Sequence, residues 1–405
     1  MRTISDFLRK LIWNLLLFFN HSSVKFGGHP PADVAGKIVV SLHRNGMLDL
    51  FLTRYLWPEV VALTSVQWHQ NFFTRWLIGG VGVTRSKDRA KKIQAENHEA
   101  LERCADLLKK GQAVGIAPEG SSQLGPGHLP FQKAAARVAA KMLENQAEVK
   151  VVPVSPVYLK AWAWRSPVEL YVGPELTFRV GLNMNEIHRE ISRALTGISL
   201  KAQDLESLMA GQAAAWEAVQ LPENKGASFS GLLLASPEQV LGQAILAYRQ
   251  RHLQIPENDT FYGALVWDKN PARPGAALTN RLIHRALALL SASARLIVWP
   301  AHRLSRSLRK KLVDDLNVVA LWRGLVAMPL IALWLLILGV GAALICSPLW
   351  ALFIWGLSIG ALVLEPLRRR YRALVKSAGH LGQGGSADYR QELQSIWLQN
   401  QTAKK

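Results

Sequence analysis

The sequence predicts an α/β protein with a mixed sheet flanked by helices, an N-terminal interfacial helix and a C-terminal two-helix transmembrane hairpin. Three observations carry this prediction. Strand-like and helix-like stretches alternate between residues 36 and 175, which is typical of helices packed on the faces of a sheet. Residues 1–27 contain an amphipathic helical pattern. No charged residue occurs from Gly324 to Leu364, about twice the length that one membrane-spanning helix needs.

Short apolar runs predict the strands of the central segment. These runs are KIVVSL, VGVTR, QAVGIAP, VKVVPVSPVYL and VELYVG. The stretches MLDLFLTRYLW, KKIQAENHEALERCADLLKK and KAAARVAAKMLE lie between them and have helical periodicity. The order of these elements places a helix between most pairs of strands, as a layered α/β domain requires.

The N-terminal pattern predicts a helix lying in the plane of a membrane surface. Ser5, Asp6, Arg9 and Lys10 occupy the polar face. The apolar face consists of Ile4, Phe7, Leu8, Leu11, Ile12, Leu15, Phe18 and Phe19. A secretory signal peptide is the alternative, but Asn14 interrupts the apolar stretch and no small-residue cleavage site follows.

The uncharged run near the C-terminus predicts two helices joined by a tight turn at Ser347-Pro348. Basic residues flank the entry at Lys310, Lys311 and Arg323, and the exit at residues 368–372. Positive charge at both ends predicts that both ends lie on the cytoplasmic side. A buried hairpin in a soluble core is the alternative.

Five regions follow from these patterns. They are an amphipathic membrane-interface helix (1–27), the α/β domain (28–200), a helical accessory region (201–310), the transmembrane hairpin with its basic flanks (311–372) and a polar C-terminal tail (373–405).

The charge of the chain predicts an anionic partner. Lys and Arg number 48 against 29 Asp and Glu, a net charge of +19. Nucleic acid and an anionic membrane both fit such a charge. The basic clusters adjoin apolar segments and the chain has 14 tryptophans, which favours anionic membrane lipids and no nucleic acid. Two cysteines, Cys104 and Cys346, predict neither a disulfide framework nor a zinc site.

The segment HRNGMLD places His43 and Asp49 after the run KIVVSL. Six positions along one helix would turn the two side chains to different faces. They can meet if His43 lies in the turn leaving the strand and Asp49 lies early in the next helix. A histidine held by a carboxylate is a general base for a hydroxyl group. A strand end that only satisfies its turn hydrogen bonds is the alternative.

Other predicted strand ends carry polar groups. Arg85 ends GVGVTR, the turn PEGSSQ with Glu119 follows IAP, and VVPVSPVYL ends a further strand. Ligand sites of open α/β sheets usually lie at the carboxyl ends of the strands. The order and spacing of these groups therefore predict one shared site.

The four blocks HRNGMLD, GVGVTRS, PEG and VPV resemble the motifs of glycerophospholipid acyltransferases of the lysophosphatidic-acid type, over residues 36–175. Five residues separate His43 from Asp49, which resembles a subgroup that includes glycerol-3-phosphate acyltransferase-like members. Ala117 stands where the family has Phe, and Ala134 where it has Gly. Neither change removes a reactive group, but both leave the acceptor open.

The resemblance implies roles for the site residues. His43 is expected to act as the general base and Asp49 to orient it. Arg85 is expected to bind the acceptor phosphate, and Glu119 to hold Arg85 or accept from a glycerol hydroxyl. The remaining expected substrate-binding residues are Gly120, Ser121 and Lys133. No metal and no cofactor is expected.

The function that the resemblance implies is transfer of a fatty acyl group to lysophosphatidic acid, which makes phosphatidic acid. Acyl-CoA or acyl-carrier protein is the expected donor. Glycerol 3-phosphate or another lysophospholipid is the alternative acceptor, and a non-catalytic membrane scaffold is the alternative function. The expected location is a bacterial inner membrane, with the active site on the cytoplasmic side.

Overall fold

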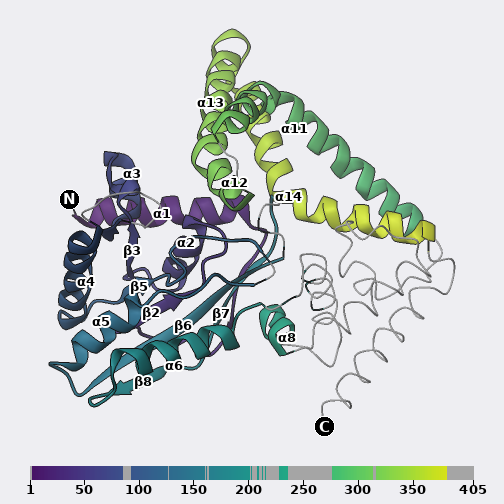
Figure 1. The fold of residues 1–405 in the computed structure, drawn as a ribbon. Helices are drawn as coiled ribbons and strands as arrows, with labels where there is room; N and C mark the ends of the chain where they lie inside the picture. The colour runs from purple at the N-terminus through teal and green to yellow at the C-terminus, as the bar shows by residue number, and fades with distance from the viewer. Residues whose placement is uncertain are drawn as a thin grey trace. The chain divides into compact units, whose positions relative to one another are not determined.

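The computed structural model describes residues 2–84, 93–125, 127–159, 161, 164–200, 202, 208, 212, 215, 228–235, 276–312 and 316–380. The chain divides into two compact units. The first comprises Met1–Lys201 with Leu316–Leu321, and the second comprises Ala202–Asp315 with Trp322–Lys405. Each unit is described by itself (Figure 1).

The first unit is built on a mixed sheet, as the sequence predicts. The described strands lie in the order β1-β7-β6-β2-β5-β3-β4, and β8 pairs with β6. Neighbours from β6 to β4 run parallel, whereas β7 and β8 run antiparallel to β6. The strands are β1 (Val24–Gly28), β2 (Ile38–Ser41), β3 (Val61–Ser65), β4 (Val81–Val83), β5 (Val114–Ile116), β6 (Glu148–Tyr158), β7 (Val168–Val172) and β8 (Leu176–Arg179).

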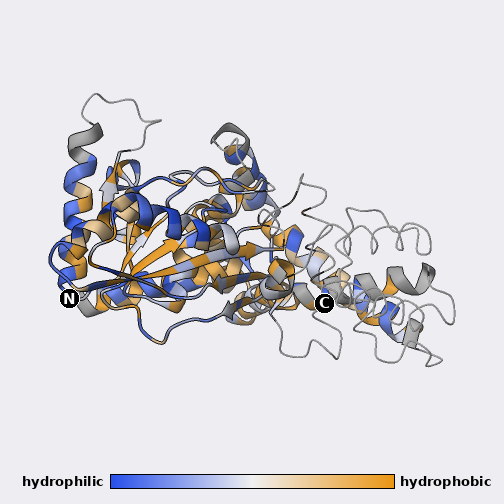
Figure 2. Ribbon diagram, turned by 60° about the horizontal axis from the view of Figure 1, so that its bottom comes forward, coloured by the Kyte–Doolittle hydropathy of each residue, from blue (hydrophilic) through white to orange (hydrophobic). Residues whose placement is uncertain are grey.

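Helices flank this sheet and bury its apolar strands. They are α1 (Arg2–Asn20), α2 (Met47–Leu56), α3 (Phe72–Ile78), α4 (Ile93–Lys109), α5 (Ala134–Leu143) and α6 (Met184–Gly197). Val39, Leu48, Phe51, Val152 and Leu170 are fully buried between the layers. Figure 2 shows the central strands in the colours of hydrophobic residues, with helices that alternate hydrophobic and hydrophilic around them. The mixed sheet flanked by helices is therefore confirmed.

Helix α1 has two apolar faces rather than one. Trp13 is buried, and its Nε1 donates to the backbone oxygen of Leu77 at 2.9 Å. The guanidinium of Arg54 lies 4.6 Å from the centre of the Trp13 ring. The opposite face is exposed and consists of Ile4, Phe7, Leu8, Leu11, Leu15 and Phe18. The first face fixes the helix to the α/β unit, and the second is free to face an apolar medium.

The second unit contains long apolar helices. They are α11 (Ala276–Leu312), α13 (Met328–Ile345) and α14 (Pro348–His380). Helix α12 (Leu316–Trp322), whose residues Leu316–Leu321 belong to the first unit, and a π-helical turn (Arg323–Ala327) precede α13. The short helix α8 (Phe229–Ala235) also belongs to this part of the chain. Three segments are long and apolar enough to cross a membrane: Leu278–Arg309, Val318–Ile345 and Pro348–Glu365.

The predicted hairpin is present as α13 and α14, which are joined at Cys346 and Ser347. Trp355 Nε1 donates to the backbone oxygen of Leu335 at 2.9 Å, and its ring lies against Gly339. A Cβ on Gly339 would come within 2.5 Å of that ring, so glycine permits the close packing. The segment in α11 was expected only as part of a helical accessory region, because its arginines conceal its apolar content.

Candidate active site

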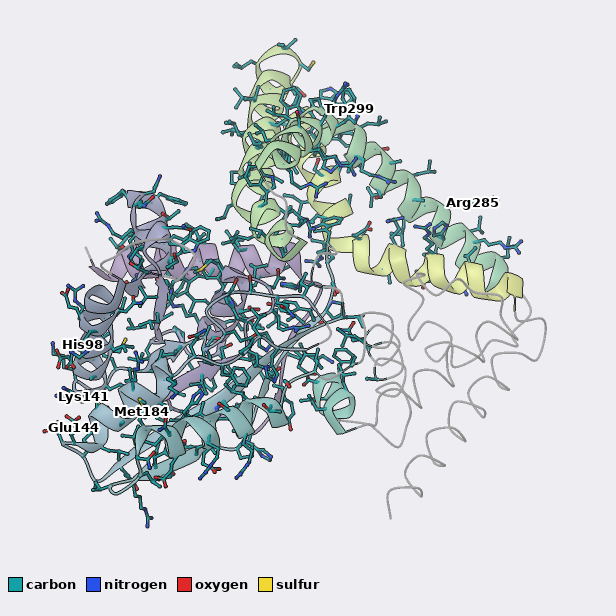
Figure 3. The ribbon with its side chains drawn as sticks, viewed as in Figure 1. His98, Lys141, Glu144, Met184, Arg285 and Trp299 are labelled. Carbon is teal, nitrogen blue, oxygen red and sulfur yellow. The ribbon has the colours of Figure 1, made fainter. Side chains whose placement is uncertain are left out.

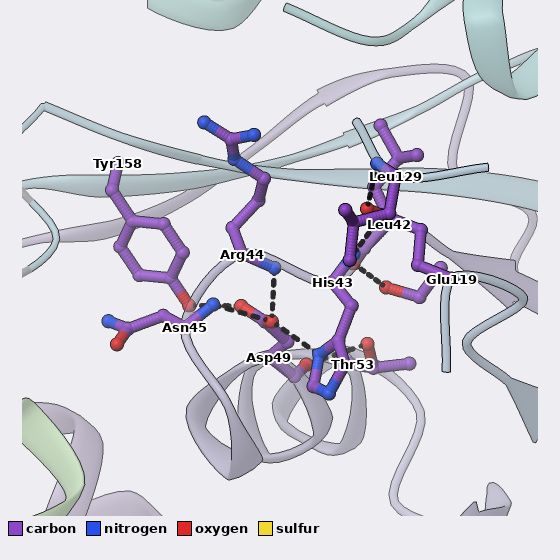
Figure 4. A network of polar contacts seen from close by, with 10 residues as sticks. Leu42, His43, Arg44, Asn45, Asp49, Thr53, Glu119, Leu129 and Tyr158 are labelled. Atoms are coloured by element: carbon purple, nitrogen blue, oxygen red, sulfur yellow. Dashed lines mark hydrogen bonds and ion pairs between the residues drawn. The ribbon is translucent and has the colours of Figure 1, made fainter. Parts of the chain in front are cut away.

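The segment HRNGMLD forms the turn between β2 and α2. His43 lies in the turn after β2, and Asp49 lies in the first turn of α2. His43 Nδ1 and Asp49 Oδ2 are 3.0 Å apart (Figure 4). The side chain of Asp49 is 4% exposed, and that of His43 is 24% exposed. The predicted approach of the two side chains, from the strand end and from the next helix, is therefore confirmed.

The carboxylate of Asp49 accepts several hydrogen bonds. The backbone nitrogens of Arg44 and Asn45 donate to Oδ2 at 2.7 and 2.8 Å. The hydroxyl of Tyr158 donates to Oδ1 at 2.6 Å. These donors and the nearby helix N-terminus stabilise an ionised carboxylate away from water. An ionised Asp49 accepts a hydrogen bond from the N–H of His43 Nδ1, so Nε2 of the neutral ring carries no proton and can accept one.

Tyr158, at the end of β6, is the partner that the sequence did not reveal. Burial first, and then the charge of Asp49, raise the pKa of the Tyr158 hydroxyl well above its usual range. A side-chain hydrogen bond from Asn45 acts in the opposite direction. Asn45 Nδ2 also donates to the backbone oxygen of Ala161 at 3.2 Å. Tyr158 therefore remains protonated and serves as a permanent donor to Asp49.

Glu119 holds the backbone of His43. It lies in the turn after β5, next to β2 in the sheet. Its Oε1 accepts from the backbone nitrogen of His43 at 2.7 Å, and its Oε2 accepts from that of Leu129 at 2.8 Å. Burial raises the pKa of Glu119, although both hydrogen bonds act to lower it. The backbone nitrogen of Gln123 donates to the oxygen of His43 at 3.0 Å, so both sides of the His43 backbone are held.

Arg44 is a residue of the motif HRNGMLD for which the sequence analysis predicts no role. Its guanidinium is buried and donates to the backbone oxygens of Gly125 and Gly127, both at 2.6 Å. Burial lowers the pKa of Arg44, while the charges of Glu119 and Asp49 raise it. Arg44 therefore fixes the loop that follows Glu119 to the turn that carries His43.

The other predicted site residues are placed differently. Gly120 has a φ of 67°, which glycine adopts without strain. Ser121 follows in the same turn and is partly exposed. Lys133 Nζ donates to Asn185 Oδ1 at 3.0 Å on the surface, and no bond between described residues joins Lys133 to His43. Arg85 lies outside the described residues. The substrate-binding roles of these residues stay predictions.

Within the described part of the chain, no group of three or more His, Cys, Asp or Glu could hold a metal ion. His98 belongs instead to a surface cluster of charges on α4 and α5, which Figure 3 labels at His98, Lys141 and Glu144. Lys141 Nζ lies 3.1 Å from Glu102 Oε1 and 3.8 Å from Glu144 Oε2. His98 Nε2 is 3.7 Å from the same Glu102 oxygen.

The arrangement of these groups is suited to proton abstraction. Asp49 fixes the ring of His43 through Nδ1, and no described residue bonds to Nε2. A hydroxyl group that approaches Nε2 can therefore lose its proton to the ring while Asp49 stabilises the charge that forms.

A family model described as Acyltransferase matches residues 26–160. The matched segment contains His43, Asp49, Glu119 and Tyr158. It supports acyl transfer as the activity of this part of the chain. No curated protein matches the chain.

One solved structure with a similar fold is that of the 1-acyl-sn-glycerophosphate (LPA) acyltransferase PlsC from Thermotoga maritima. It is 17% identical, with a TM-score of 0.36, and the likeness covers 48% of this chain and 79% of that chain.

Proposed function

We propose that the chain is a membrane-bound O-acyltransferase that moves a fatty acyl group from a thioester donor to lysophosphatidic acid and makes phosphatidic acid. The observation that carries this proposal is the contact of 3.0 Å between His43 Nδ1 and Asp49 Oδ2. It leaves Nε2 available to a hydroxyl group. It lies inside the segment that matches the Acyltransferase family model.

The proposed reaction is a direct transfer without an acyl-enzyme. The acceptor hydroxyl gives its proton to His43 Nε2 while its oxygen attacks the thioester carbonyl. The tetrahedral intermediate then breaks its carbon–sulfur bond, and the departing thiolate takes the proton from His43. Asp49 stabilises the imidazolium between these two steps, because its carboxylate remains ionised throughout.

The acceptor phosphate requires a cation, and Arg85 is the proposed partner because a guanidinium binds phosphate through two donors. Ser121, Gly120 and Lys133 are proposed to complete the acceptor site. Glu119 is proposed as a positioning residue, since its two oxygens accept from the backbone nitrogens of His43 and Leu129. A contact of Glu119 with Arg85 or with a glycerol hydroxyl remains part of the proposal.

The proposed location is a bacterial inner membrane, with the active site on the cytoplasmic side. The acyl chain of a lysophospholipid resides in the bilayer, so an enzyme at the headgroup level reaches its acceptor directly. The exposed apolar face of α1 and the hairpin of α13 and α14 support this placement. The net charge of +19 favours anionic lipid and an anionic donor, acyl-CoA or acyl-carrier protein.

The test is acyl transfer by the purified full chain in mixed micelles. Lysophosphatidic acid, glycerol 3-phosphate and other lysophospholipids are offered as acceptors, each with acyl-CoA or acyl-carrier protein as donor. Phosphatidic acid is the expected product, and His43→Ala is expected to lower its rate by about 10²–10⁴-fold.

His98→Ala is the matched control, because His98 is an exposed histidine of the same unit. Equal rates for wild type and His43→Ala with every acceptor would overturn the proposal. Transfer to glycerol 3-phosphate alone would replace the proposed acceptor and leave the proposed chemistry intact.

A further inference from the structure

Helix α11 presents two chemically different exposed sides. Exposed leucines lie along one side: Leu278, Leu282, Leu289, Leu296 and Leu304. Exposed arginines lie along the adjacent side: Arg281, Arg285, Arg295, Arg303 and Arg306. At 100° per residue the two sets occupy separate stripes that run the length of the helix. Leu296 is 77% exposed, so no described residue covers the leucine stripe there.

A third side of α11 packs within its own unit. Ala294, Ala301 and Ser305 are buried there. Trp334 Nε1 of α13 donates to the backbone oxygen of Ile297 at 2.7 Å. These contacts fix the rotation of α11 about its axis, and they leave both the leucine stripe and the arginine stripe outside.

A membrane-spanning position does not suit α11, although the helix is long and apolar enough for one. Arg285 and Arg303 are about 27 Å apart along the helix, close to the thickness of the hydrocarbon layer. Arg295 would then lie near the middle of the bilayer, where an arginine is costly. Its Nε donates to the backbone oxygen of Ser291 at 3.1 Å, and no described carboxylate pairs with it.

The charges at the two ends of α11 lead to the same conclusion. Arg281 and Arg285 lie near the start of the helix, and residues 306–311 carry a basic run at its end. A single crossing would place one of these clusters on the translocated side, against the usual distribution of positive charge. The hairpin of α13 and α14 has no charged residue from Gly324 to Leu364 and meets no such difficulty.

We infer that α11 lies along the bilayer surface, on the side that holds both ends of the hairpin, and binds anionic phospholipid headgroups. The leucine stripe enters the acyl-chain boundary and the arginine stripe contacts phosphates. Trp299 and Arg285 mark the helix in Figure 3. The Arg303 guanidinium lies 5.2 Å from the centre of the Trp299 ring, and tryptophan prefers headgroup depth. The inference rests on the proposed membrane location and not on acyl transfer.

The first test is the topology of α11 in sealed membrane vesicles. Thr279→Cys and Ser307→Cys are made separately in the full chain with Cys346→Ser, and a membrane-impermeant maleimide is added from one side. Cys104 is buried and is not expected to react. Both engineered thiols are expected to label from the same side, and the native Cys346 of the unmodified chain from the opposite side. Labelling of positions 279 and 307 from opposite sides would overturn the inference.

The second test is the depth of α11 in reconstituted vesicles. Spin labels are placed at Leu289→Cys and Leu296→Cys on one stripe, and at Arg285→Cys and Arg303→Cys on the other. A surface helix gives two equally deep leucine positions and two equally shallow arginine positions. A depth that instead follows residue number through the bilayer would overturn the inference.

The lipid partner is tested with the same labels. Vesicles of phosphatidylcholine are compared with vesicles that also contain phosphatidylglycerol, which is expected to draw the leucine positions deeper. The combined variant Arg281→Gln, Arg306→Gln should lose most of that shift. Equal depth in both lipids would overturn the anionic partner. Acyl transfer measured on the same vesicles separates the proposed activity from the proposed surface position of α11. A chain that is inactive but has both ends of α11 on one side would contradict only the proposed activity.

Discussion

The α/β unit and the C-terminal helical unit place their charged groups in opposite ways. In the α/β unit Asp49, in the first turn of α2, and Glu119, in the turn after β5, are buried, and both oxygens of each carboxylate accept hydrogen bonds. In the helical unit the arginines of α11 are exposed, beside leucines that are equally exposed.

The difference matches the medium that each unit is proposed to meet. A buried carboxylate is stable only when donors replace the water that it has lost, and the site supplies these donors from three segments of chain. Exposed leucines are costly in water and favourable in hydrocarbon. Leu344 and Ile345 at the tip of the hairpin are 82% and 84% exposed. One unit therefore creates a polar site inside a protein core, and the other exposes an apolar surface of the kind that suits a bilayer.

Replacing the buried carboxylate should give the largest effect. In Asp49→Asn the new side-chain amide meets groups that all donate hydrogen bonds. Its nitrogen cannot accept from them, so either His43 or a neighbouring donor loses its acceptor. We expect acyl transfer to fall by about 10²–10⁴-fold. We also expect the free energy of unfolding to fall by about 3 kcal/mol, because a buried donor is left unsatisfied. Initial rates and denaturant unfolding measure the two effects.

Asp106→Asn is the control for that variant, because Asp106 is exposed on α4 and its contact with Lys109 Nζ is long, at 4.0 Å. It should change neither rate nor stability. An Asp49→Asn variant as active as this control would show that the pairing with His43 has no catalytic use.

Glu119→Gln should have the next largest effect. The amide can replace only one of two acceptors, so either His43 or Leu129 loses its hydrogen bond, at a cost of about 1–3 kcal/mol in unfolding free energy. If Glu119 positions His43, kcat falls and KM for the acceptor stays the same. A rise in KM with unchanged kcat would instead show direct binding of the acceptor.

The pH dependence of stability provides a second measurement on Glu119. Burial raises its pKa, so the folded chain holds this proton more tightly than the unfolded chain. The stabilisation that protonated Glu119 contributes to the folded chain is fully present below the usual pKa of glutamate. It is lost as pH rises through the raised pKa of Glu119 in the folded chain. Wild type should lose stability relative to Glu119→Gln across that range. A constant difference between the two would contradict the assigned direction.

The residues that could be predicted in the site are those that one local pattern reveals. A histidine and an aspartate flanking a strand-to-helix turn can be read from HRNGMLD alone. The role of Tyr158 could not be predicted, because Tyr158 lies 109 residues from Asp49 in sequence and resembles one more apolar position of a strand. From its sequence position alone, Arg44 would be taken for a surface cation. Only the position of the loop at Gly125 and Gly127 shows that its guanidinium is buried and bonded there. Long-range pairing, rather than residue type, decides both roles.

Tyr158→Phe should have a moderate effect on the same carboxylate. The ring volume is kept and one buried donor is removed, so unfolding free energy should fall by about 1–2 kcal/mol. The carboxylate of Asp49, whose Oδ1 has lost the hydrogen bond from Tyr158, becomes more basic and stabilises the imidazolium. The low-pH limb of kcat should therefore move to higher pH, with KM unchanged. A pH profile like that of wild type would limit Tyr158 to packing.

Tyr171→Phe is the matched control, since Tyr171 lies on the neighbouring strand β7 opposite Ser155 and outside the site. It loses the same hydroxyl and should keep the wild-type pH profile.

The fold outside the site shows the same limit of local patterns. The sequence patterns do not predict the strands β1, β3 and β8, because VKFGG contains glycines, VALTS follows a helix without a clear alternation, and LTFR begins a stretch that is mostly helical in pattern. Helix α11 was expected only as part of an accessory region, since its arginines interrupt each apolar run. The leucine stripe and the arginine stripe of α11 can be recognised only once the structure shows that the helix is continuous and which of its sides is packed.

Replacing either cysteine should have the smallest effect on the protein. The reactivity of their thiols compares the two units directly. Cys104 is buried in the α/β unit, and burial raises the pKa of its thiol to about 12. Cys346 is exposed at the turn of the hairpin. Only a thiolate reacts readily with a maleimide. We therefore expect one thiol of the folded chain to label in detergent at neutral pH, and a second to label after unfolding in dodecyl sulfate.

Mass spectrometry of the labelled peptides identifies the reactive thiol in each state. Cys346→Ser should abolish labelling of the folded chain, whereas Cys104→Ser should leave it unchanged. Labelling of Cys104 at the rate of Cys346 would show that α4 leaves the sheet often enough to expose its buried face. The α/β unit would then lack the rigid packing that holds β5, and with it Glu119, beside His43.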